Sequence, residues 1–147
     1  MTATAHALVG TVIAAKVGNP ALAIPIALGS HIIMDAIPHW DTATHRKDKS
    51  WNALFLHSTI DGIFGFILSV LLIYFVFPNT SYMYAFIMII IAQLFDWLMA
   101  PYYFFGIKFF KPFYKFQKLY DHKLDKPWGI VTQVVFVAAI ILLAKTF

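Results

Sequence analysis

Residues 51–77, WNALFLHSTIDGIFGFILSVLLIYFVF, form a long apolar stretch that ends at Pro78-Asn79. At about 1.5 Å per residue, an α-helix of this length exceeds the ~30 Å hydrocarbon core of a bilayer. His57 and Asp61 are the only residues of the types Asp, Glu, His, Lys and Arg inside it. The stretch therefore predicts a membrane-spanning helix that carries an imidazole and a carboxylate in its first three turns.

The composition of the whole chain agrees with a membrane protein. Of the 147 residues, 61% are hydrophobic and 12% are charged, and the mean hydropathy is +0.74. Soluble domains carry roughly 25% charged residues. The absence of cysteine excludes disulfides and thiolate metal sites. We expect a single integral membrane domain over residues 1–147.

Four further helical segments are predicted, which gives an all-α, polytopic membrane bundle of about five helices. The first is short, about 20 Å, so the sequence leaves open whether it fully crosses the membrane. A basic and aromatic stretch, residues 108–118, predicts a short helix at the cytoplasmic-side interface. The four segments run from about Ala3 to Lys16, from Pro20 to just before Pro38, from Tyr82 to Phe105, and from Trp128 to the C-terminus.

The basic residues predict the orientation. Nine of them lie in the loops 38–51 and 106–127, whereas Lys16 and Lys145 lie on the opposite side of a five-span arrangement. Cytoplasmic loops of membrane proteins carry an excess of Lys and Arg. We therefore expect a multi-pass protein of a bacterial-type inner (plasma) membrane, with the N-terminus and both polar loops in the cytoplasm.

The ionisable residues inside the apolar segments are the strongest functional signal. Placing a charged side chain inside a membrane span costs about 2.5–3.5 kcal/mol on insertion scales, so each of these residues needs a compensating role. Two pairs share the spacing HxxxD, which places both side chains on one helix face. A lone membrane histidine is commonly a hydrogen-bond partner, and one such pair can be a simple ion pair. Several imidazoles and carboxylates at the same depth in the membrane favour a metal site. The candidate ligands are His6, His31, Asp35, His39, His57, Asp61 and Asp96.

Imidazole and carboxylate ligands suit zinc, with manganese or iron as alternatives, and the pattern predicts one or two divalent ions. A metal-activated water would be the nucleophile, and Asp41 or Asp96 would be the general base. His45 lies beside the charged residues 46–49 and is typical of a solvated loop. Asp121 and His122 lie among lysines and are interpreted as interfacial polar residues.

Three motifs stand out together: Thr4-Ala5-His6, the segment Gly29-Ser30-His31-Ile32-Ile33-Met34-Asp35-Ala36-Ile37-Pro38-His39-Trp40-Asp41, and the HxxxD pair at 57–61. In these motifs the sequence resembles the small bacterial membrane-bound metal-dependent hydrolases. It is more distantly similar to zinc-dependent phospholipase C and the related single-strand nucleases. The resemblance covers residues 1–61. It implies that both HxxxD pairs, the intervening His39 and the early His6 are metal ligands in an all-α hydrolase.

The predicted function is metal-dependent hydrolysis of a phosphoester in a lipid or lipid-linked substrate. Lysines of the stretch 108–118 would attract anionic lipid or a phosphorylated substrate. Membrane lipids are the expected partners, nucleic acid is not expected, and the oligomeric state is left open. A proton or divalent-metal transporter using the same cluster, and a b-type haem protein, stay as alternatives.

Overall fold

The computed structural model describes all 147 residues and is entirely helical. The predicted all-α fold is confirmed. Seven α-helices and two short 3-10 helices follow one another along the chain. They are α1 (Ala3–Lys16), α2 (Pro20–Ala36), η1 (Arg46–Asp48), α3 (Trp51–Val76), α4 (Tyr82–Ala92), α5 (Leu94–Phe105), η2 (Lys108–Phe110), α6 (Lys111–Gln117) and α7 (Trp128–Thr146).

Local sequence signals explain where these helices begin. The side chains of Thr2, Asn19, Ser50 and Ser81 each accept a hydrogen bond from a backbone N–H in the first turn of α1, α2, α3 and α4, respectively. Such caps satisfy N–H groups that have no partner within the helix. Pro20 is the first residue of α2, a position where the missing N–H costs nothing.

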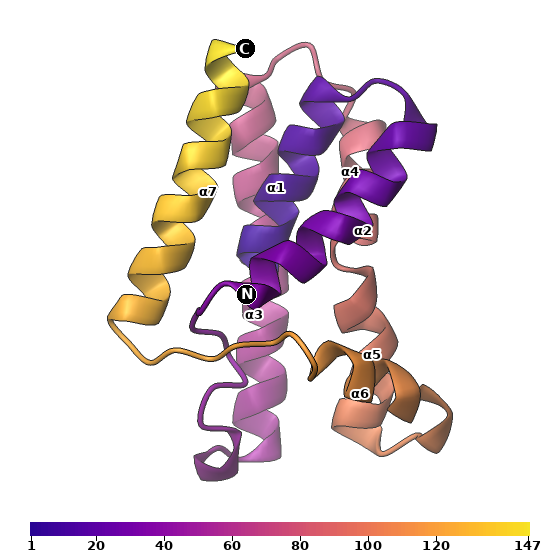
Figure 1. Ribbon diagram of the computed structural model, residues 1–147, viewed down its shortest axis with the longest axis vertical. Coiled ribbons are helices and arrows are strands. Elements are labelled where there is room, and N and C mark those ends of the chain that lie inside the picture. Colours follow the sequence, from indigo (N-terminus) through magenta and orange to yellow (C-terminus); the bar gives the residue numbers. More distant parts are fainter.

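Helix α1 is the central helix and packs against α2, α3, α4 and α7 (Figure 1). Small residues make this possible. A Cβ atom added to Gly10 would lie 2.9 Å from the Met88 carbonyl oxygen of α4. A Cβ atom added to Gly65 of α3 would lie 2.9 Å from the Cα of Thr4. Close backbone approach through small residues is the usual means of helix association in membranes.

Helices α3 and α7 are long and apolar enough to cross a membrane, and α4 with α5 makes a third span if the bent pair is counted as one. The shorter α1 and α2 form a hairpin beside them. In Figure 1 the N-terminus lies near the middle of the molecule, and α2 returns from the upper end to the same level. The hairpin thus brings the start of α1 and the end of α2 together, well inside the molecule.

The structure divides the predicted helix 82–105 into α4 and α5, which are bent by 51° at Gln93. Gln93 has φ −103° and ψ 7°, so it leaves the helical region at a point where the sequence has no glycine or proline. Its side chain is buried. The break places the end of α4 and the first turn of α5 next to the end of α2.

Residues 118–127 connect α6 to α7 by running back across the molecule, beneath the end of α2 (Figure 1). The segment is held by backbone hydrogen bonds to residues 35–40. The His122 N–H donates to the Asp35 carbonyl (3.0 Å), the His39 N–H donates to the His122 carbonyl (3.1 Å), and the Leu124 N–H donates to the His39 carbonyl (2.7 Å). This return segment therefore covers the end of α2 and adds its own side chains to that region.

Candidate metal centre

The carboxylate of Asp35 is the centre of the buried polar region. Its oxygen Oδ1 lies 3.1 Å from Nε2 of His6 and 3.8 Å from Nε2 of His39. Its other oxygen, Oδ2, lies 3.3 Å from Nε2 of His31. The Met1 amine also contacts Oδ1. Three imidazoles from α1, α2 and the following loop thus surround one acid that is 2% exposed.

The orientation of His31 is fixed by the end of α4. Its Nδ1 donates a hydrogen bond to the carbonyl oxygen of Ala92 (2.7 Å). Nδ1 therefore carries a proton, and in the neutral ring Nε2 holds a lone pair. That Nε2 faces Asp35, yet it makes no hydrogen bond. A ring nitrogen held by a backbone carbonyl on its other side is the arrangement found in metal-ligating histidines.

His39 is held in the same way. Its Nδ1 donates to the carbonyl oxygen of Ile37 (2.8 Å), and its Nε2 lies 3.4 Å from Oδ1 of Asp121 without making a hydrogen bond. Both side chains are almost fully buried. Two histidines therefore present a ring nitrogen to a carboxylate oxygen with no aligned proton between them. A bound cation would satisfy the two ring nitrogens and Oδ2 of Asp35, whereas Oδ1 of Asp121 also contacts the Lys123 amine.

Lys123 supplies positive charge to the outer part of this region. Its Nζ contacts the carboxylates of Asp41 and Asp121, the latter at 2.7 Å, and Lys118 contacts Asp121 at 2.9 Å. Burial alone would raise the pKa of Asp41, but the charge of Lys123 outweighs it and lowers that pKa. Burial would likewise raise the pKa of Asp121, and His39 with the two lysines holds it well below its usual range.

The side chains form two groups whose nitrogen and oxygen atoms lie within 4.8 Å of one another: His6, His31 and Asp96, and His39, Asp41 and Asp121. Asp35 lies between the groups because its oxygens approach histidines of both. Metal bonds of about 2.0–2.1 Å in a tetrahedral site place ligand atoms about 3.3 Å apart. The separations of 3.3 Å between His31 and Asp35 and of 3.4 Å between His39 and Asp121 fit that spacing, whereas the 3.1 Å contact of His6 with Asp35 is a hydrogen bond.

Asp96 reaches the site from the first turn of α5. Its Oδ1 lies 4.0 Å from Nε2 of His31 and accepts a hydrogen bond from Nε2 of Gln117 (2.6 Å). The same amide nitrogen lies 3.4 Å from Oδ2 of Asp35. At 30% exposure, the Asp96 carboxylate is more accessible than that of Asp35, which is 2% exposed. Asp96 is therefore the partly exposed member of the His6, His31 and Asp96 group.

The second HxxxD pair lies outside both groups. His57 is exposed on α3 and makes no side-chain hydrogen bond or ion pair. The Asp61 carboxylate instead accepts hydrogen bonds from the backbone N–H groups of Ala3 (2.7 Å) and Thr4 (3.2 Å), and from the Thr4 hydroxyl (2.7 Å). Asp61 thus satisfies the first turn of α1, the helix that carries His6.

Sequence reasoning missed Asp121, Lys123 and Gln117 as members of the polar region. Asp121-His122 was interpreted as an interfacial pair, whereas Asp121 faces the buried histidines and His122 is exposed. The only signal was an acid next to a histidine in a polar loop. Nothing in the sequence shows that the loop runs back to α2.

Comparisons with protein-family models, with curated proteins and with solved structures found no match to this chain.

Proposed function

We propose that this protein is a membrane-embedded, metal-dependent hydrolase that cleaves a phosphoester of a lipid or lipid-linked substrate. One observation carries the proposal: the buried Nε2 atoms of His31 and His39 have no hydrogen-bond partner and lie 3.3 and 3.4 Å from carboxylate oxygens, which is the spacing of ligands on a common cation. Bound zinc, manganese or iron would supply an activated water and charge stabilisation for a phosphoester. The resemblance of residues 1–61 to membrane-bound hydrolases adds support from the sequence.

The chain's own residues have distinct roles in this proposal. His6, His31 and Asp35 hold the ion, and His39 with Asp121 offers a second position. Asp96 is better suited than Asp41 to accept a proton, because Asp96 has no cationic partner and is partly exposed, whereas Lys123 neutralises Asp41. A general base needs a free carboxylate within reach of the reacting water.

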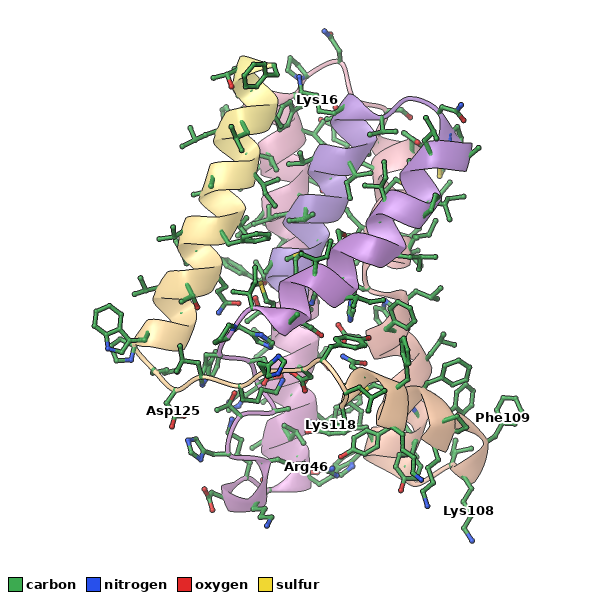
Figure 2. All side chains as sticks on the ribbon, viewed as in Figure 1. Lys16, Arg46, Lys108, Phe109, Lys118 and Asp125 are labelled. Carbon is green, nitrogen blue, oxygen red and sulfur yellow. The ribbon has the colours of Figure 1, made fainter.

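The site would open towards the cytoplasm. Figure 2 shows Arg46 and Lys108 at the lower end of the molecule, Lys118 above them, and Lys16 at the opposite end. The positive-inside tendency then places the lower end on the cytoplasmic side.

Elemental analysis of protein purified without added metal tests the metal centre. We expect one or two zinc, manganese or iron ions per chain, and Asp35→Asn should reduce the content at least tenfold because it weakens the central ligand. Release of phosphate from short-chain phosphatidic acid, and of nitrophenol from bis(p-nitrophenyl) phosphate, tests the reaction. Metal-free wild-type protein would refute the metal centre, and metal-loaded protein inactive on both compounds would refute the phosphoesterase assignment.

A further inference from the structure

A cavity of about 580 Å³ lies at the lower end of the molecule, between η1 and the α5–α6 segment. None of its lining residues belongs to the two His/Asp groups. Figure 2 shows Arg46 and Lys108 at this end of the molecule, far from Lys16. Three basic side chains and several aromatic ones line it: Arg46, Lys108, Lys111, Tyr102, Tyr103, Phe104 and Tyr114, with Gly106.

The three cations of this cavity have no acidic partner. No carboxylate lies within 4.0 Å of Arg46, Lys108 or Lys111, and no acidic residue lines the cavity. Lys118 and Lys123, by contrast, pair with Asp121. An anion in the cavity would give these three uncompensated positive charges a partner of opposite sign.

The Arg46 side chain is held in place by Tyr103. Its Nη2 donates to the Tyr103 carbonyl oxygen (3.1 Å), and its guanidinium lies 4.0 Å from the centre of the Tyr103 ring. Tyr103 is 8% exposed, and its hydroxyl is buried without a hydrogen-bond partner. A guanidinium held in this position at the cavity suits the oxygens of a phosphate group.

Exposed apolar side chains lie next to the cavity. Phe105, Ile107 and Phe109 are 63%, 47% and 78% exposed, respectively. Phe109 points outward at the tip of the segment, beside Lys108 (Figure 2). Aromatic and aliphatic side chains next to lysines are typical of segments that lie at the boundary between headgroups and acyl chains. The bound phosphate would therefore belong to a molecule that also carries acyl chains.

We propose that this cavity binds the phosphate of an anionic phospholipid. The proposal does not depend on the metal centre or on any hydrolytic activity. It differs from a general attraction of lysines to the membrane, because it assigns binding to three side chains at one cavity. Lys115 provides a matched control: it lies on the same α6 helix, is exposed and unpaired, and does not line the cavity.

Native mass spectrometry of the full-length protein in detergent tests this. Phosphatidylglycerol and phosphatidylcholine of identical acyl chains are titrated against wild type, Arg46→Gln/Lys108→Gln/Lys111→Gln and Lys115→Gln. Wild type and Lys115→Gln should prefer phosphatidylglycerol. The triple variant should lose most of this preference and Lys115→Gln should keep it, because the proposal assigns the charge-assisted contacts with the phosphate to the three cavity side chains alone. Circular dichroism establishes that each variant is folded.

Three results would overturn the proposal. The first is an equal preference for both lipids in wild type. The second is a loss of phosphatidylglycerol preference in Lys115→Gln that is as large as the loss per replaced residue in the triple variant. That result would indicate a general attraction of lysines to anionic lipid. The third comes from a parallel titration with inorganic phosphate. If phosphate stabilises wild type but not the triple variant, and the lipid preference is the same in both, the ligand is free phosphate. Metal content is recorded in parallel, so failure of the metal centre is recognised separately.

Discussion

Replacing Asp61 separates its structural role from a metal-binding role. The sequence pattern predicts that Asp61 is a ligand, whereas its carboxylate accepts three hydrogen bonds from Ala3 and Thr4 at the start of α1. Loss of a helix-capping side chain costs about 0.5–2 kcal/mol. A charged acceptor with several donors lies at the upper end of this range. We expect Asp61→Ala to lower the free energy of unfolding by about 2 kcal/mol.

Asp61→Asn distinguishes the hydrogen-bonding role of Asp61 from a metal-binding role with a smaller structural change. The amide oxygen can still accept from the Ala3 N–H, so we expect a loss of about 1 kcal/mol. Unfolding by SDS in mixed micelles, followed by circular dichroism, measures the stability. Metal content is measured on the same samples, with Asp35→Asn as the variant of identical charge change. Asp61→Asn should retain its metal and Asp35→Asn should lose it. If Asp61→Asn loses metal as fully as Asp35→Asn, with unchanged unfolding, our reading of Asp61 is wrong.

Three further perturbations have defined outcomes. In Gly129→Ala the new Cβ would lie 2.6 Å from the backbone nitrogen of Trp40, so we expect a loss of about 3 kcal/mol in SDS unfolding, whereas Gly18→Ala, with open space around it, should be neutral. Lys123 lowers the pKa of Asp41 in the folded protein below its ordinary value of 3.8. The ionised Asp41 therefore stabilises the folded state above pH 3.8, and this stabilisation is lost as the pH falls through the lower pKa of the folded state. Lys123→Met should therefore move the acid unfolding midpoint, followed by circular dichroism, to higher pH. Dialysis against a chelator should lower the thermal midpoint of wild type, and added zinc should restore it; an unchanged midpoint would contradict a bound ion.

The helix positions could be predicted from the sequence because the relevant signals are local. A hydroxyl or amide side chain precedes four of the apolar segments, and Pro20 marks the start of α2. Helix α1 has the predicted bounds, Ala3–Lys16. Capping residues and periodic apolar positions act within one or two turns, so no knowledge of the tertiary structure is required.

The bend at Gln93 and the position of Asp121 depend on tertiary packing. No glycine or proline marks the bend, and its observed consequence is the contact between His31 and the Ala92 carbonyl. Asp121 enters the site because the return segment pairs with residues 35–40 of a distant part of the chain. Neither feature has a local pattern, so sequence reasoning could name His31 and Asp35 as partners but not the acid across from His39.

The two HxxxD pairs show the limit of motif spacing. Spacing places both side chains on one face of a helix, but it does not say what that face meets. The end of α2 is covered by α1, by α5 and by the return segment, so His31 and Asp35 are buried. The start of α3 is open on the side of His57, which is exposed, and Asp61 meets the first turn of α1. Identical spacing therefore leads to a buried cluster in one case and a helix cap in the other.

The location of the candidate site follows from the need to satisfy helix ends inside an apolar protein. Helix α1 begins, α2 ends and α4 breaks within the same region, and each leaves backbone groups without partners inside the helix. The buried polar groups supply those partners: Asp61 accepts from the first turn of α1, the His122 N–H donates to the Asp35 carbonyl, and His31 donates to the Ala92 carbonyl. Because His31 donates through Nδ1, its Nε2 faces the acids. The contacts that complete the helices thus also orient the proposed ligands, which is why His6, His31 and Asp35 lie on the hairpin of the shorter helices α1 and α2.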